Sequence, residues 1–208
     1  MPEVQVTNPS GGILGGDHLE MDGAVRAGAS ATVITQDDNK ACRGAESSQD
    51  AVLRAEGGAF LEYLPHHLIP HGESDYRQRT VFRLASGATI IAWDAFAAGG
   101  TRGERFEFAC LRGRVEIQRG DIPEGFDSFD LTGGSGPLGG YSAAFYVLAP
   151  RDVAPLAEDL HHQLGGVTGA LAAASAPASG LCVVRVLDGV APALYRALNF
   201  ARDCSWIA

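Results

Sequence analysis

Alternating apolar and polar residues dominate the first two-thirds of the chain and predict a series of short β-strands. Turn signals such as Asn8-Pro9 and Gly57-Gly58 separate these segments at intervals of roughly eight to twelve residues, which is typical of an all-β sandwich, barrel or solenoid. The predicted strands cover residues 4–7, 17–23, 31–35, 51–55, 60–64, 76–84, 89–96, 106–118, 122–131 and 142–148.

The last third of the chain changes to a helical pattern. Apolar residues recur at three- and four-residue spacing over residues 150–164, which predicts a helix there. Pro150 suits the start of this helix, and Gly165-Gly166 are expected to end it. The other elements predicted here are a short helical turn at 170–174, a strand at 181–187 and a second helix at 192–202.

Together these patterns predict a mainly β fold, built as layered sheets or as a β-helix-like coil, with two helices in the C-terminal third. The sequence shows no clear internal repeat and no linker, so residues 1–208 are expected to form a single domain. The 27 glycines are about 13% of the chain against a usual share of roughly 7%, which fits a protein built from many tight turns.

The charge balance narrows the function classes. The 16 basic and 25 acidic residues give a formal net charge of −9, and Lys40 is the only lysine. Nucleic acids and anionic membranes both attract dense basic segments, so neither is an expected partner. The N-terminus has no signal-peptide pattern, and the longest uncharged stretch, 164–184, is interrupted by glycine, serine and proline. A cytoplasmic location is therefore expected.

The cysteines predict neither a disulfide framework nor a zinc site. Cys42, Cys110, Cys182 and Cys204 are far apart in the sequence and form no CxxC pair. We expect most of them to be ordinary packed or surface residues.

Two glycine-rich loops could suggest a catalytic or nucleotide-binding site. A dinucleotide fingerprint must open a helix after a strand, whereas strand-like alternation follows the glycines of residues 11–17. We therefore expect a tight structural turn there and no cofactor. The loop at 133–136 is not a serine-hydrolase elbow, because Pro137 stands where the last glycine should be.

The histidines of residues 66–73 form the most suggestive group for metal binding. His67 and His71 would share one face of a strand, but Pro70 interrupts that strand, and the histidines are adjacent or four and five positions apart. The group only approximates the HxH pattern, with a later glutamate, of jelly-roll metalloenzymes. Two interpretations stay open: solvated histidines at a strand end, or a metal site.

Several polar residues lie inside apolar strand segments, where burial would be costly. Glu62 lies between Leu61 and Tyr63, and Asp94 follows Trp93. Alternation can place these carboxylates on a solvent-exposed face of the sheet. If they instead line an interior passage, each needs a hydrogen-bond partner or water to offset its burial. Such a row would suit a divalent cation in transit. The spacing assembles no nucleophile with an adjacent base, so the residues alone indicate no enzyme.

Five sequence blocks occur in order along the first half of the chain. Residues 8–17 are similar to an NPxGGxxGGD signature, and 35–43, 61–70 and 103–106 are similar to TQxxxKxYR, LEWLPxxxIP and RGERF, with 78–94 between the last two. The motif positions are Asn8, Pro9, Gly11, Gly12, Gly15, Gly16, Asp17, Thr35, Gln36, Lys40, Arg43, Pro65, Gln78, Arg79 and Trp93. In this order the blocks resemble the family of the urease accessory protein UreD, called UreH in some organisms.

The resemblance implies a largely β-structured scaffold with a pair of helices and no enzymatic activity. UreD-like proteins join the accessory proteins UreF and UreG on apo-urease and assist GTP-dependent nickel delivery, with GTP hydrolysed by UreG. No cofactor is expected to bind tightly, and nickel(II) would only be in transit. An internal path for nickel has been proposed for the family, and Glu62, Asp94 and Glu104 are the candidates to line it here.

The sequence also departs from the family pattern. Cys42 stands where the pattern has an aromatic residue, and His66, His67 and His71 stand where relatives usually have other residues. The chain begins almost at the first motif, so the family's N-terminal segment is expected to be missing. The alternatives are a small cupin-like metalloenzyme that uses the cluster at 66–73, and a β-rich domain that has lost its maturation role.

Overall fold

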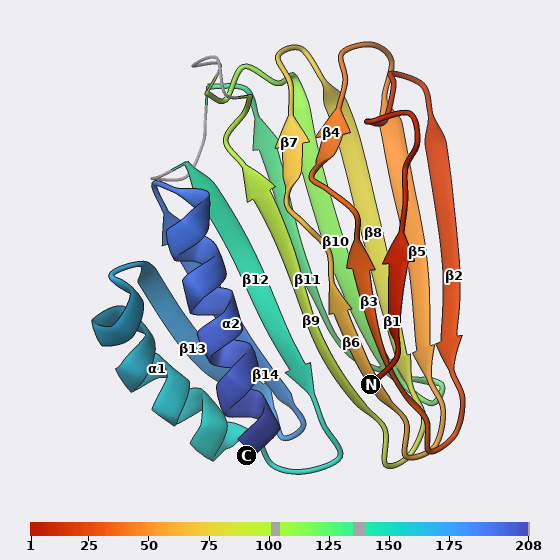
Figure 1. Cartoon of the computed structure of the whole chain (residues 1–208), viewed down its shortest axis with the longest axis vertical. Coiled ribbons are helices and arrows are strands. Elements are labelled where there is room, and N and C mark those ends of the chain that lie inside the picture. Colours follow the sequence, from red (N-terminus) through yellow and green to blue (C-terminus); the bar gives the residue numbers. More distant parts are fainter. Residues whose placement is uncertain (101–104, 135–139, 208) are drawn as a thin grey trace.

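The computed structural model describes residues 1–100, 105–134 and 140–207 and consists mainly of β-strands (Figure 1). The elements are β1 (Glu3–Val6), β2 (His18–Val25), β3 (Ser30–Thr35), β4 (Asn39–Ala41), β5 (Ser47–Ala55), β6 (Phe60–Leu64), β7 (Leu68–Pro70), β8 (Asp75–Leu84), β9 (Thr89–Ala97), β10 (Cys110–Arg119), β11 (Ile122–Thr132), β12 (Tyr141–Leu148), α1 (Ala154–Thr168), β13 (Leu171–Ala178), β14 (Leu181–Asp188) and α2 (Ala191–Ile207).

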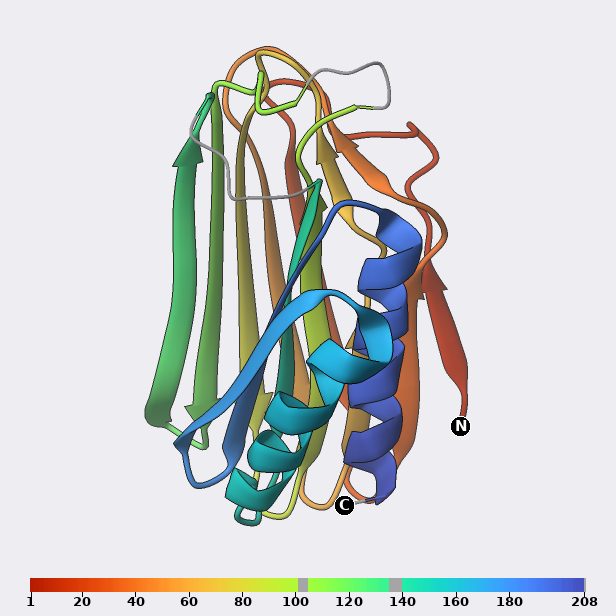
Figure 2. The ribbon, with the colours of Figure 1, turned by 90° about the vertical axis from the view of Figure 1, so that its left-hand side faces the viewer.

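The strands form two facing sheets, which Figure 2 shows from the side. The nine-stranded sheet has the order β1-β3-β6-β9-β12-β14-β13, with β4 and β7 beside this path. The five-stranded sheet has the order β11-β10-β8-β5-β2. At one side of the sandwich the edge strands are therefore β1 and β2, and at the other side they are β11 and β13.

From β2 to β10 the longer strands alternate between the two sheets, so the chain winds as a flattened coil. Paired residues on most neighbouring parallel strands lie 29 or 30 positions apart, as in Ser30–Phe60 and Phe60–Thr89 of one sheet and His18–Ser48 of the other. The β8–β10 pairs, which begin with Asp75–Cys110, lie 35 positions apart. Beyond β10 the pairing becomes antiparallel, through β10–β11 and through β9–β12–β14–β13. The predicted mainly β, β-helix-like fold is confirmed.

Both helices pack on the outer face of the nine-stranded sheet, α1 against β13 and β14 and α2 against β9, β12 and β14 (Figure 1). Leu156 and Leu160 of α1 and Leu198 of α2 pack in one buried cluster with Phe145 of β12 and Val184 of β14. The prediction of two helices in the last third of the chain is thus confirmed. Neither of these described helices is both long and apolar enough to cross a lipid bilayer.

Both predicted bounds of the first helix are wrong. The helix begins at Ala154, with Pro155 in its first turn, and not near Pro150. α1 continues through Gly165 and Gly166 to Thr168, and it ends at Gly169, which has the left-handed conformation with φ 70°. Each glycine inside a helix costs about 1 kcal/mol relative to alanine. The buried Leu164 side chain belongs to the cluster between the helices and the sheet, and this packing outweighs that cost.

The helical turn expected at 170–174 is also wrong. This alanine-rich segment forms the first part of β13. The strand pairs with β14 from Leu171–Leu187 to Ala178–Leu181. The high helix propensity of alanine is a weak preference, and pairing with a neighbouring strand overrides it. The three-residue strands β4 and β7 were too short to be predicted.

Candidate functional site

A band of polar side chains crosses the interior of the sandwich between two apolar clusters. On the inner face of β9, Ala92 belongs to one cluster and Phe96 to the other, and Asp94 lies between them. Because alternate residues of a strand share a face, these three side chains point toward the five-stranded sheet. From that sheet Gln78 Nε2 donates a hydrogen bond of 3.0 Å to Asp94 Oδ1.

A cavity of about 580 Å³ extends from the edge strands β1 and β2 to this polar band. Its walls come from separate segments of the chain, and Asp94 and Gln78 line its inner end. The motif residues that line it are Asn8, Pro9, Gly11, Thr35, Gln36, Lys40, Pro65 and Gln78. The fold therefore gathers several of the sequence blocks around one space.

The environment of Asp94 favours its neutral form. Burial raises the pKa of Asp94 to about 6, although the hydrogen bond from Gln78 opposes this shift. The negative charge of Asp127 raises the pKa further, and the positive charge of Arg185 lowers it. Asp94 is therefore a carboxyl group that can exchange a proton close to neutral pH.

A second cavity of about 180 Å³ continues from Asp94 toward the opposite side of the sandwich, and Asp94 lines both spaces. Tyr146, Asp127 and Arg185 line this second cavity and also a groove of about 350 Å³ between β11 and the β13–β14 hairpin. The Tyr146 hydroxyl donates a 2.6 Å hydrogen bond to Asp127 Oδ2. The three spaces share residues and follow one another from one edge of the sandwich to the other.

Sequence reasoning singled out none of Tyr146, Asp127 and Arg185. One signal was present: Asp127 is in phase with Phe129 and Leu131, which pack against the interior cluster near β9. This alternation places the Asp127 carboxylate on the inner face of β11. The alternation within β11 does not show which side chains of the other sheet face Asp127.

Glu62 lies on the other face of the nine-stranded sheet from Asp94. Its side chain is fully buried beneath α2, where Arg202 donates hydrogen bonds of 2.5 and 2.8 Å to its two oxygens. Trp206 Nε1 and Thr32 Oγ1 donate bonds of 2.9 Å. Burial would raise the pKa of Glu62, but these hydrogen bonds hold it below its ordinary value.

The two described path candidates, Glu62 and Asp94, are thus not brought together. Glu62 fixes a helix to the outside of the sheet, whereas Asp94 faces the space between the sheets. Glu104, the third candidate, lies outside the described residues. Of the two described candidates, Asp94 is the one that lines an interior cavity.

The histidines of residues 66–73 do not converge. His66 is exposed at the wall of the large cavity, and its Nδ1 lies 3.0 Å from the backbone oxygen of Thr35. His67 is buried, and its Nδ1 lies 3.0 Å from Asp38 Oδ1 and 3.0 Å from the Tyr195 hydroxyl. Burial lowers the pKa of His67, against the opposing effect of Asp38.

His71 belongs to a different cleft, which it lines with Cys42, Glu73 and Glu107. Within residues 1–100, 105–134 and 140–207, no three His, Cys, Asp or Glu side chains come close enough together to hold a metal ion. The geometry of this segment therefore gives no support to a resident metal at the three histidines.

The glycine-rich segment forms the tight turn that the sequence predicts. A Cβ on Gly12 would lie 2.9 Å from the Lys40 carbonyl oxygen, and one on Gly15 would lie 2.5 Å from Gly44 Cα. Asn8 Nδ2 donates a 3.0 Å hydrogen bond to the Gly12 carbonyl. The glycines thus let this segment lie against the 40–44 backbone, where it forms part of the wall of the large cavity.

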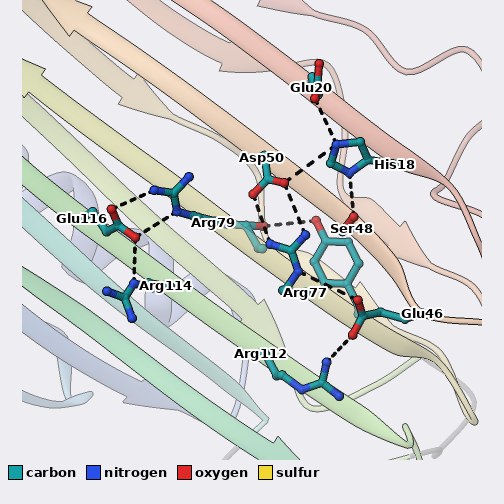
Figure 3. A network of polar contacts seen from close by, with 12 residues as sticks. His18, Glu20, Glu46, Ser48, Asp50, Arg77, Arg79, Arg112, Arg114 and Glu116 are labelled. Carbon is teal, nitrogen blue, oxygen red and sulfur yellow. Dashed lines mark hydrogen bonds and ion pairs between the residues drawn. The ribbon is translucent and has the colours of Figure 1, made fainter.

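Trp93 and Arg79 of the motif have structural partners, whereas Arg43 is exposed. Trp93 Nε1 donates a 2.6 Å hydrogen bond to the Pro65 carbonyl. Arg79 pairs with Glu116 through two bonds of 2.9 Å. It belongs to a charged network on the outer face of the five-stranded sheet (Figure 3), whose labelled members also include His18, Glu20, Glu46, Ser48, Asp50, Arg77, Arg112 and Arg114.

The four cysteines are free and scattered. Cys110 and Cys182 are buried, and Cys42 and Cys204 are partly buried. Burial raises the pKa of Cys182 to about 11, so this thiol stays protonated at neutral pH. Two packed and two partly buried cysteines agree with the expectation of ordinary packed or surface residues.

Comparison with known proteins agrees with the resemblance that the sequence blocks carry. The family described as UreD urease accessory protein matches residues 1–205. The urease accessory protein UreD of Haloarcula marismortui is 32% identical over 217 aligned positions, covering 96% of this chain and 71% of the relative. That of Alkalilimnicola ehrlichii is 33% identical over 195 positions, covering 89% of this chain and 67% of the relative.

The relatives are longer than this chain. The match to the urease accessory protein UreD of Anaeromyxobacter sp. is 37% identical over 130 positions, but it covers only 61% of this chain and 44% of that protein. The family match nevertheless extends over nearly all of the 208 residues. The chain belongs to the UreD family of urease accessory proteins.

Proposed function

We propose that this chain is a non-enzymatic maturation factor for urease. Together with UreF-like and UreG-like proteins it docks on apo-urease in the cytoplasm and assists the insertion of nickel(II) into the active site. The UreG-like partner hydrolyses GTP in this scheme, and the chain itself holds the ion only in passing. Family membership supports the role in urease maturation.

The observation that carries the nickel proposal is the cavity that ends at Asp94. The motif residues gather around it, and its inner end offers the oxygens of a carboxylate and an amide. Oxygen ligands of this kind suit a hydrated divalent cation. Conduction requires binding that is favourable enough for entry and weak enough for release, and a single carboxylate with a raised pKa meets this need.

The test is co-expression of the urease subunits and accessory proteins with this chain, as wild type or as the Asp94→Asn variant. We expect the variant to lower the nickel content and the activity of the purified urease by roughly tenfold or more. Asp121→Asn removes a carboxylate from an exposed turn and is the matched control, which should behave as wild type.

Co-purification with the UreF-like partner should be the same for both variants, because Asp94 lies inside the sandwich. Full urease activation by Asp94→Asn would reject the path through Asp94. A lack of co-purification by the wild-type chain would reject the scaffold role. One tightly held metal ion per isolated chain would instead favour the metalloenzyme alternative.

A further inference from the structure

The ion pair between Asp127 and Arg185 stands where the second cavity meets the groove at the β11–β13 edge. Both residues line both spaces, together with Tyr146. Arg185 Nη2 contacts Asp127 Oδ1, and the Tyr146 hydroxyl donates to Oδ2 at 2.6 Å. Each oxygen of this carboxylate is therefore occupied by a donor from a strand of the opposite sheet.

The pair also acts electrostatically on Asp94. The Asp127 charge raises the pKa of Asp94 and the Arg185 charge lowers it, so the three groups lie within Coulomb range of one another. A cation that reaches Asp94 through the first cavity would be attracted by Asp127 and repelled by Arg185. The position of the guanidinium thus decides whether the second carboxylate is available.

Arg185 can leave this position at little cost. Its side chain is 52% exposed and that of Asp127 is 19% exposed, so the pair lies at the solvent side of the passage. An ion pair with this much exposure contributes only about 0–1 kcal/mol to stability. A divalent ion brings twice the charge of the guanidinium and can therefore displace it, whereas a monovalent ion brings no more charge than Arg185 does.

We infer that Arg185 is a gate that occupies the place of a cation at Asp127. An incoming divalent cation displaces the guanidinium and is then shared by Asp94 and Asp127 before it leaves through the groove. The identity of the ion as nickel(II) in transit rests on the proposed function. The displacement itself is a property of this chain and can be measured without urease.

The experiment is a calorimetric titration of the purified full chain with Ni²⁺. Arg185→Gln removes the competing charge, and we expect it to bind Ni²⁺ about tenfold more tightly than wild type, as for the loss of one unit charge at close range. Arg54→Gln is the matched control. Its side chain is 36% exposed and is paired with the carboxylate of Asp22, and it lines none of the cavities described above.

Arg54→Gln changes the net charge as much as Arg185→Gln does, but away from these cavities, so it should leave the affinity within about twofold of wild type. Arg185→Lys keeps the charge and should bind as wild type. The double variant Arg185→Gln/Asp127→Asn should lose the whole gain. Equal affinities for Arg185→Gln and Arg54→Gln would overturn the gate.

A second variant decides the matter if Arg185→Gln fails to fold, as judged by its thermal melting curve. Asp127→Asn in the otherwise wild-type chain removes the second carboxylate and must weaken Ni²⁺ binding, so an unchanged affinity would overturn the gate. Failure of the two proposals is distinguishable. If Arg185→Gln binds Ni²⁺ more tightly but Asp94→Asn still activates urease fully, the gate is retained and the proposed function is rejected. If Arg185→Gln binds Ni²⁺ no more tightly but Asp94→Asn fails to activate urease, the gate is rejected and the proposed function is retained.

Discussion

Asp94 is a carboxyl group that the fold keeps in an unfavourable place. Its folded-state pKa is raised from 3.8 to about 6, chiefly by burial. The folded state therefore binds a proton more readily than the unfolded state does. The stability linked to this group is fully present below pH 4 and is lost as the pH rises through about 6.

Asp94→Asn should therefore stabilise the protein above pH 6. We expect a gain in the free energy of unfolding of about 1–3 kcal/mol at pH 7.5, because the neutral amide carries no ionisation cost. The gain should shrink toward zero near pH 4. Urea denaturation at both pH values measures it, and Asp121→Asn, on an exposed turn, should show no such trend.

A destabilised or unchanged Asp94→Asn variant at pH 7.5 would contradict the raised pKa. The expected result has a further use, because the same variant is expected to lose urease activation. When a replacement improves stability and impairs activity, the original residue serves the function of the protein at a cost in stability.

The sequence could identify Asp94 as unusual but could not separate it from Glu62. Both carboxylates lie in apolar strand segments of the nine-stranded sheet. The part of that sheet that holds both residues is covered on one face by α2 and on the other by the second sheet, so most residues on both faces are apolar. The alternation of apolar and polar residues then does not distinguish the inner face of the sheet from the outer face. Only the packing partners show which carboxylate faces the cavities.

At the scale of elements, one buried carboxylate fixes α2 to the sheet. Glu62 of β6 is bound by Arg202 and Trp206 near the end of α2 and by Thr32 of the neighbouring strand β3. The hydrogen bonds hold the pKa of Glu62 below its ordinary value. The stability linked to this group is therefore present above about pH 4.5 and is lost as the pH falls through the folded-state pKa.

Glu62→Gln should loosen this attachment. The amide leaves the guanidinium of Arg202 without its counter-charge, and we expect a loss of about 2–3 kcal/mol in the free energy of unfolding at neutral pH. Urea denaturation measures the loss, and hydrogen exchange should show α2 opening before the sheet. Glu20→Gln, with a 79% exposed side chain, is the control and should change stability by less than about 0.5 kcal/mol. Equal stability of the two variants would contradict the anchoring role.

The strands were largely predictable because the alternation of side chains is local information. The strand predicted at 60–64 matches β6, and the one at 76–84 starts one residue after β8 begins. The segment at 171–178 was not predictable, because its strand state depends on pairing with β14. The coil was hidden for a related reason: the pairing distance of 29 or 30 residues recurs while the residues themselves do not.

At the scale of the whole molecule, the interior spaces run across the sandwich from one pair of edge strands to the other. Ala144 of β12 lies at the middle of this passage: it pairs directly with Asp94 of β9 and lines the central cavity of about 180 Å³. Its small side chain leaves the space beside the carboxylate open. The size of the side chain at residue 144 is therefore expected to control the passage of the ion, without any change in charge.

Ala144→Leu should close the passage while the chain still folds. We expect the free energy of unfolding to stay within about 1 kcal/mol of wild type, because the added carbons fill existing space. Urease activation and the nickel content of urease should fall, with co-purification of the UreF-like partner unchanged. Ala24→Leu, on an exposed position of β2, is the control. Full activation by Ala144→Leu in a folded complex would show that the ion takes another route.

The position of Lys40 has a practical consequence. It is the only lysine of the 208 residues, and it lines the large cavity that leads to Asp94. An amine-reactive fluorophore will therefore attach to one side chain at the wall of that cavity, apart from the terminal amine, which its lower pKa distinguishes. Paramagnetic ions quench such dyes at short range, so the arrival of nickel could be timed in a stopped-flow instrument without engineering a single new residue.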